Sequence, residues 1–237
     1  ENGEWDEDLE GLWIGKYETS RSNATSTSGG SGTILKVQPG VCSFGGVSVG
    51  NAYTYSQAYS IEIESHMLKN SEWGVVAYLT ESAYGRNGTE ITQNTSSSIT
   101  GSAKCSDGNT TTDYTSADGQ KASSTGNVYG IYDLSGGKNE YVVGYYNGPD
   151  ASATRISFGS SFASIGGEST KYATTYNSTS DRQSYKYGDA IYETKGWHSD
   201  YNTFFFPSDP FLTRGGGSGD NSSNGLFYYY NMYRRPK

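Results

Sequence analysis

Long apolar runs are missing from this sequence, and so are broad clusters of basic residues. No stretch of about 18 apolar residues occurs, which is the length that a membrane-spanning helix needs. Lys and Arg number 17 against 25 Asp and Glu, which gives a net charge of −8. Nucleic acids and anionic membranes attract proteins through clustered positive charge. We therefore expect no nucleic-acid partner and no direct insertion into a membrane.

Cysteine and histidine are also scarce. The two cysteines, Cys42 and Cys105, are candidates for one disulfide or for two free thiols, because an even count alone does not decide between them. The two histidines, His66 and His198, have no Cys or second His nearby in the sequence to complete a metal or nucleophile site. No Gly-x-Ser-x-Gly, His-Glu-x-x-His or P-loop motif occurs either. These absences predict a protein that is not an enzyme.

Aromatic residues can build a hydrophobic core that the low aliphatic content alone would not provide. Only 33% of the residues are hydrophobic, yet 14% are aromatic, including 22 Tyr and 4 Trp. Disordered chains usually lack aromatic residues, whose rings bury large areas and can build a core. We expect one folded, loop-rich domain over residues 1–237. The Ser-, Thr-, Asn- and Gly-rich segment at about 85–125 is expected to be a polar insertion that is laid over the surface.

The hydrophobic periodicity predicts a mixed α+β domain. Residues 13–18 alternate between apolar and polar types, as in a half-buried strand. An apolar residue at every fourth position predicts a helix over residues 56–68, and a second short helix is expected at 74–84. Residues 128–146 form the densest apolar block and predict buried structure.

Three blocks of sequence, in the same order, resemble the formylglycine-generating-enzyme-like branch of the C-type lectin fold. Residues 11–18, GLWIGKYE, are similar to the opening strand of that family. Residues 127–141, NVYGIYDLSGGKNEY, resemble its N-x-[FY]-G-L-Y-D-M-S-G-N-V-W-E-W block, and residues 212–217, LTRGGG, resemble its [LV]-x-R-G-G-S block. The resemblance implies a C-type lectin-like fold of short antiparallel strands, two helices and long irregular polar loops.

The resemblance also bears on catalysis and on metal binding. The enzymes of the family use a cysteine pair that follows the third block, and this sequence has no cysteine after Cys105. Some members bind calcium through a Gly-Asn-x-x-Glu segment of the second block. Here Glu140 matches the glutamate, but Gly137 stands in place of the asparagine. We expect no cofactor, with calcium as the alternative; a glycosidase that uses Asp133 and Glu140 is the remaining alternative for an enzyme.

The family also contains binding proteins, among them variable proteins of diversity-generating retroelements and phage receptor-binding proteins. The resemblance implies that their last strands and loops present the ligand surface. After the third block this sequence is rich in Tyr, Asn, Ser and Gly, which antibody loops favour for contact area and adaptable hydrogen bonding. Successive strand residues face opposite sides, so Tyr228, Tyr229 and Tyr230 cannot all serve on one face. The predicted contact residues are Asp220, Asn221, Asn224, Phe227, Tyr228, Tyr229, Tyr230, Asn231 and Tyr233.

Together these features predict a non-enzymatic binding or display domain. We expect it to be extracellular, on a cell surface or on a virion, and to recognise a protein or glycan ligand on a cell surface. The alternative is a self-assembling structural subunit of a phage particle or a surface filament, which would form a homo-oligomer.

Overall fold

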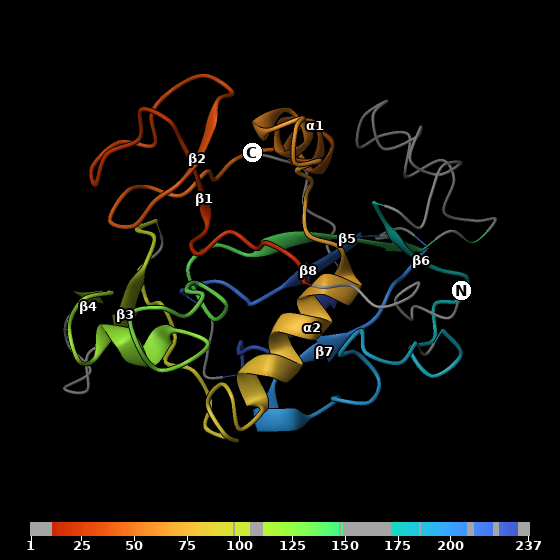
Figure 1. The fold of residues 1–237 in the computed structure, drawn as a ribbon. Coiled ribbons are helices and arrows are strands. Elements are labelled where there is room, and N and C mark those ends of the chain that lie inside the picture. The colour runs from red at the N-terminus through yellow and green to blue at the C-terminus, as the bar shows by residue number, and fades with distance from the viewer. Residues whose placement is uncertain are drawn as a thin grey trace.

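The fold is a mixed α+β arrangement in which one long helix crosses a five-stranded sheet (Figure 1). Helix α1 covers Val49–Tyr59 and helix α2 covers Asn70–Glu81. No helix in the described part of the chain is long and apolar enough to cross a bilayer. The computed structural model describes residues 11–96, 98–104, 111–146, 148, 172–184, 186–207, 211–219 and 223–231.

The main sheet has the strand order β6-β5-β8-β9-β7. Its central pairs, β5 with β8 and β8 with β9, are antiparallel, as expected, but the outer strands β6 and β7 join in parallel. A register shift interrupts the β5–β8 ladder between Val142 and Tyr145. The strands are β5 (Glu140–Tyr146), β6 (Thr174–Tyr176), β7 (Asn202–Thr203), β8 (Phe211–Arg214) and β9 (Tyr229–Asn231).

Helix α2 begins where the sequence supplies a cap. The Glu72 carboxylate accepts a hydrogen bond from the backbone N–H of Lys69 at 2.8 Å, which satisfies a donor that the first helical turn leaves free. The expected helix over 74–84 is therefore confirmed in type, but it starts four residues earlier, at Asn70, and ends at Glu81.

The expected helix over 56–68 is largely wrong. Helix α1 starts at Val49, where the Ser48 hydroxyl accepts a hydrogen bond from the N–H of Asn51, and it ends at Tyr59. A tight turn follows, because the Ser65 hydroxyl donates to the carbonyl of Ser56 at 2.7 Å and accepts from the N–H of Ser60 at 2.8 Å. Local side-chain hydrogen bonds of this kind compete with helix continuation.

The core lies between α2 and the sheet. Trp73 on α2 is 1% exposed, and its indole N–H donates to the carbonyl of Leu226 at 3.0 Å. Val76 and Ala77 on the same helix pack in the cluster that contains Leu212 of β8 and Tyr229 of β9. Helix α2 therefore covers one face of the strands that carry the predicted contact residues (Figure 1).

The N-terminal part forms two small antiparallel pairs beside this core. Strand β1 (Thr19–Arg21) pairs with β2 (Leu35–Val37), and β3 (Ser102–Lys104) pairs with β4 (Thr111–Asp113). The strand expected over 13–18 is wrong, because the first strand begins at Thr19.

The segment at about 85–125 contributes to packing, although it was expected to be too polar for that. Ile91 joins the main core, while Ala103 and Ala122 form a small cluster with Tyr17 and Tyr132. A short 3-10 helix, η1 (Gly119–Ala122), belongs to this region. Many of its described polar residues hydrogen-bond within the segment, and a few apolar side chains pack it against the rest of the fold.

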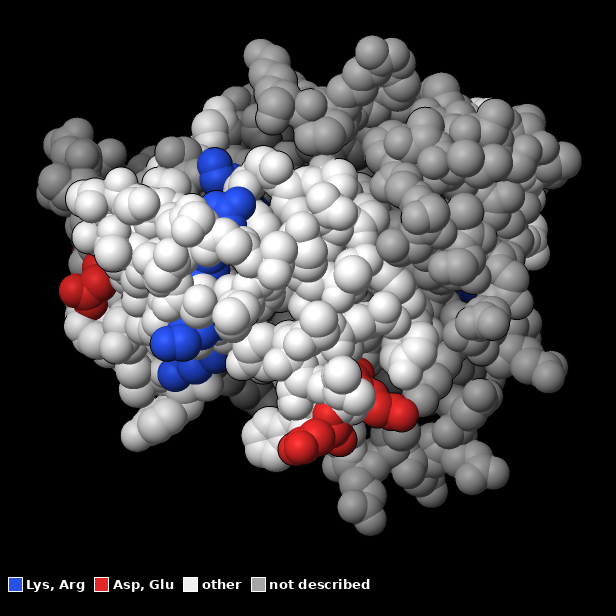
Figure 2. All heavy atoms as spheres, turned by 90° about the horizontal axis from the view of Figure 1, so that it is seen from above, with Lys and Arg blue, Asp and Glu red and all other residues white. Residues whose placement is uncertain are grey.

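The surface above the sheet, on the side of α1, is mostly neutral. Lys and Arg lie toward one side of this view and Asp and Glu at its edges, while most of the described surface carries neither (Figure 2). The described part of this face therefore presents no broad patch of one charge.

Candidate functional site

Two neighbouring tyrosines of strand β9 differ in exposure, one buried and the other exposed. Tyr229 is 0% exposed, whereas its neighbour Tyr230 is 39% exposed. The alternation expected for Tyr228, Tyr229 and Tyr230 is thus present, and only Tyr230 of the three faces outward.

Most of the predicted contact residues within the described part are buried. Phe227 is 0% exposed, and Asn224, Tyr228 and Asn231 are each below 7%. The expectation that these side chains and Tyr229 lie on the surface is wrong, because β9 lies between β8 and β7 and α2 covers the face that Tyr229 occupies. Asp220, Asn221 and Tyr233 lie outside the described residues, so their contact role stays a prediction.

Tyr230 has an exposed aromatic neighbour that the sequence did not suggest. The ring of Tyr201, 52% exposed, lies 6.0 Å from the ring of Tyr230, and the buried ring of Tyr228 stacks behind Tyr230 at 6.4 Å. Trp197, 41% exposed, packs its ring against Phe227 at 5.1 Å. We call Trp197, Tyr201 and Tyr230 the C-terminal aromatic surface.

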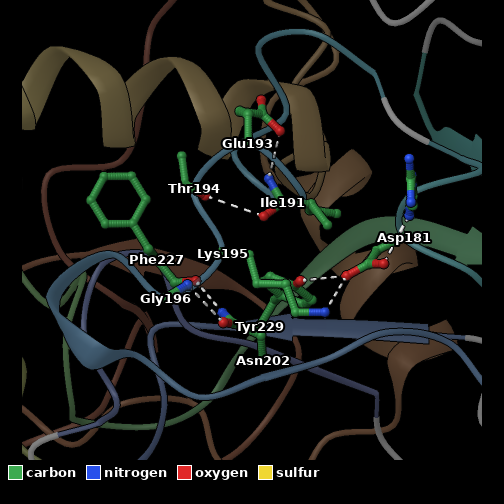
Figure 3. Close-up of polar contacts among 10 residues, drawn as sticks. Asp181, Ile191, Glu193, Thr194, Lys195, Gly196, Asn202, Phe227 and Tyr229 are labelled. Carbon is green, nitrogen blue, oxygen red and sulfur yellow. Dashed lines mark hydrogen bonds and ion pairs between the residues drawn. The ribbon is translucent and has the colours of Figure 1, made fainter.

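The loop that carries Trp197 is held by its own polar side chains (Figure 3). The Glu193 carboxylate accepts from the N–H groups of Ala190 and Ile191 at 3.1 and 3.3 Å. The Asn202 side chain accepts from the N–H of Gly196 at 3.1 Å. These contacts satisfy the backbone of an irregular segment and fix its path.

Further bonds attach this loop to β9. The Asn202 amide donates to the carbonyl of Phe227 at 3.3 Å. Asp181 pairs with Lys195 at 2.7 Å and accepts from the Tyr229 hydroxyl at 3.3 Å (Figure 3). The two segments that carry the C-terminal aromatic surface are thus joined by hydrogen bonds beneath it.

Asp200 also links the loop to the turn that precedes β9. Its Oδ1 accepts from the N–H of Gly225 at 2.7 Å, and its Oδ2 accepts from the N–H of Phe227 at 2.9 Å. The N–H of Tyr201 donates to the carbonyl of Ser223 at 2.7 Å. Burial raises the pKa of Asp200, while the two N–H donors oppose that rise.

An apolar hollow of about 610 Å³ lies on the outer side of α2. Val75, Tyr78, Leu79, Tyr84 and Tyr187 are among its lining residues. The ring of Tyr78 also meets Trp197 at 6.3 Å. The hollow therefore adjoins the C-terminal aromatic surface through one aromatic contact.

The block that resembles the family's calcium segment holds two carboxyl groups close together. Glu18 accepts from the N–H of Lys138 at 2.6 Å, and both carboxyl oxygens of Glu140 are buried without a hydrogen-bond donor among the described residues. Burial raises the pKa of both groups. The charge of Asp133 adds to the rise at Glu18, and the charges of Glu18 and Asp133 add to the rise at Glu140. A proton on one of the two carboxyl groups can therefore be shared between them.

The described residues contain no group of three or more His, Cys, Asp or Glu side chains placed to hold a metal ion. Asp133, the partner of Glu140 in the glycosidase alternative, accepts from the N–H groups of Gly101 and Glu18 and from the Asn94 amide, at 2.9 to 3.1 Å. Its oxygens thus join two backbone segments and the side chain of Asn94. Cys42 is unpaired among the described residues, and Cys105 lies outside them, so the disulfide stays a prediction.

No protein-family model matches this chain, and no curated protein sequence matches it.

Proposed function

We propose that this chain is a non-enzymatic binding domain of an extracellular or virion surface, with a C-type lectin-like fold. It recognises a protein or glycan ligand on a cell surface through Trp197, Tyr201 and Tyr230. The observation that carries the proposal is the pair of exposed rings, Tyr201 and Tyr230, on a backbone that is hydrogen-bonded on both sides.

A rigid aromatic pair suits a contact surface for two physical reasons. Tyrosine offers a large amphipathic area and has few rotatable bonds, so little conformational entropy is lost on binding. The support below Tyr230 is already ordered by Tyr228 and by pairing with β7 and β8, so binding requires little rearrangement. Exposed aromatic clusters also tend to mark interaction sites.

The chemistry available at the carboxyl groups supports binding over catalysis. Asp133 and Asp200 each accept backbone N–H groups that hold the fold, and Glu140 is buried away from the C-terminal aromatic surface. A general acid or base must reach its substrate within hydrogen-bond distance. The buried position of Glu140 does not offer that reach.

The test is a binding screen with labelled protein against a printed glycan array and a panel of intact bacterial cells. We expect the double variant Tyr201→Ser, Tyr230→Ser to lose at least about tenfold in affinity, since central aromatic contacts carry about 1–2 kcal/mol or more each. Tyr129→Ser is the matched control, because Tyr129 is 87% exposed and lies in another part of the chain. Equal binding by the double variant and the control would contradict the proposal.

The self-assembling subunit remains the second candidate, favoured by the apolar hollow on α2. Leu79 is 56% exposed and Tyr84 is 90% exposed at its rim. Light scattering on the purified chain tests it: a concentration-dependent rise in mass that Leu79→Lys abolishes supports assembly, and a monomer at all concentrations contradicts it.

A further inference from the structure

Two carboxyl groups face the turn that leads into β9. Gly225 lies against both: a Cβ atom there would collide with Glu90 Oε1 and would lie 2.7 and 2.8 Å from the two oxygens of Asp200. Glu90 and Asp200 therefore approach the same point from different parts of the chain.

Asp200 is the member of the pair that holds the turn. It accepts the N–H groups of Gly225 and Phe227, and the turn then continues into Tyr229 and Tyr230. Whatever weakens the hold of Asp200 on these two N–H groups also loosens the start of β9.

Glu90 is held beside Asp200 by the backbone on either side of it. Thr89 donates its N–H to the carbonyl of Arg86 at 3.1 Å, and Thr92 donates to the carbonyl of Lys121 at 3.0 Å. Ile91 between them is buried in the main core. The backbone of Glu90 thus cannot move away from Asp200 without disturbing the core.

The other charged groups around the pair come from three elements. Glu81 at the end of α2 lies 3.1 Å from His198 Nε2, and the His198 ring stacks over Phe227. Arg214 on β8 acts on Asp200 from the sheet. Burial, and then the charge of Asp200, raise the pKa of Glu90 to about 7; Glu81 adds to the rise, and His198 opposes it.

We propose that Glu90 and Asp200 form a pH-sensitive latch on the C-terminal aromatic surface, which is closed when Glu90 is protonated and loosened when Glu90 is charged. The role of the latch in regulating ligand recognition rests on the function proposed above. A charged Glu90 repels the carboxylate that holds Gly225 and Phe227, and protonation of Glu90 removes that repulsion.

The ratio of closed to open turn depends on pH because the pKa of Glu90 differs between the two states. When the turn opens, water reaches Glu90 and its pKa returns to about 4.3. The closed state, in which that pKa is higher, is therefore favoured at low pH and loses population as pH rises through 7. Between pH 6 and pH 8 the ratio of closed to open turn is expected to fall about tenfold.

Amide hydrogen exchange at Gly225 and Phe227, followed by NMR and corrected for the intrinsic pH dependence of exchange, measures this ratio directly. We expect the protection of both amides to fall about tenfold from pH 6 to pH 8 in the unaltered chain. Glu90→Gln, which cannot ionise, keeps its protection at both pH values. Glu62→Gln, a change at an exposed carboxyl group, behaves as the unaltered chain.

Equal protection at pH 6 and pH 8, or a tenfold loss that persists in Glu90→Gln, would overturn the latch. If Glu90→Gln does not fold, a carboxyl ¹³C titration of the unaltered chain decides: a Glu90 midpoint near 7 supports the latch, and a midpoint near 4.3 refutes it.

These measurements need no ligand, so their failure is separate from failure of the proposed function. For any glycan or cell that the screen identifies, affinity should fall about tenfold between pH 6 and pH 8 and should be constant in Glu90→Gln. A ligand bound through Tyr201 and Tyr230 with pH-independent affinity would overturn the regulatory role and leave the binding surface intact.

Discussion

The guanidinium group of Arg214 lies over the ring of Tyr229, with its Cζ atom 5.7 Å from the ring centroid, and both residues are 0% exposed. The indole of Trp73 lies 5.6 Å from the same guanidinium. Arg214 also donates from Nη2 to the carbonyl of Ala190 at 2.9 Å. Burial lowers the pKa of Arg214 to about 10, which leaves it charged at neutral pH, and the charge of Asp189 opposes this lowering. One buried cation thus joins α2, β8, β9 and the loop before Trp197.

Replacing Arg214 should strongly reduce the stability of the fold. We expect Arg214→Met to lower the free energy of unfolding by about 3–5 kcal/mol, because the Ala190 carbonyl loses its donor and Asp189, whose pKa burial raises to about 7, loses the cation that favours its charged form. Arg182→Met, at an exposed arginine, should change it by less than about 0.5 kcal/mol. Urea unfolding measures both, and similar values for the two variants would refute this role of Arg214.

Substitutions of the two neighbouring tyrosines of β9 should differ strongly in their cost to stability. Tyr229→Ala should cost about 3–5 kcal/mol, as expected for a large ring removed from a core. Tyr230→Ala should cost less than about 1 kcal/mol, because its ring is partly exposed. Thermal and chemical unfolding of both variants provide the measurement. The reverse order would mean that β9 pairs in a different register.

The buried carboxyl pair should make the domain less stable as pH rises. The folded-state pKa values of Glu18 and Glu140 lie above their unfolded values, so their contribution is fully present below about pH 4.3 and is lost as pH rises toward and past neutrality. Glu140→Gln should therefore raise the free energy of unfolding by about 1 kcal/mol or more at pH 8 and change it little at pH 4. The same gain at both pH values would disprove the assignment.

Gly74 should tolerate no side chain, although it lies inside a helix. Alanine normally favours a helix over glycine by about 1 kcal/mol. Here a Cβ at Gly74 would collide with the carbonyl oxygen of Gly188 and would lie 2.9 Å from the Cα atom of Asp189. We expect Gly74→Ala to destabilise the domain by about 1–3 kcal/mol in urea unfolding. A more stable variant would show that the 188–189 backbone can move away.

The sequence predicted the features that depend on local spacing. Helix α2 and the alternation along β9 were both anticipated, because each follows from a short periodic pattern. The start of α2 and the position of α1 were not anticipated, because side-chain hydrogen bonds at the helix ends decide them. The Glu72 carboxylate accepts from the N–H of Lys69 at the start of α2, and the Ser65 hydroxyl closes a turn after Tyr59 at the end of α1.

The candidate site was predicted only at Tyr230. Trp197 and Tyr201 come about 30 residues earlier in the sequence. They reach the site through the parallel pairing of β7 with β9, which no local sequence pattern predicts. Phe227 and Tyr229 were assigned to the surface because the composition of a tyrosine-rich stretch does not show which of its side chains α2 will cover. Burial of this kind is decided by tertiary packing, which outweighs the preference of a single segment.

The order of strands in the main sheet also has a kinetic consequence. Val142 on β5 pairs opposite Leu212 on β8, about 70 residues later, and β9 is inserted between β8 and β7. Such distant pairings form slowly, because the chain loses loop entropy before it gains the contacts. An interior strand of the sheet, β9, comes from residues 229–231, after all of its partner strands in sequence. We therefore expect that the five-stranded order forms late in folding, because β8 and β7 can be joined only through β9.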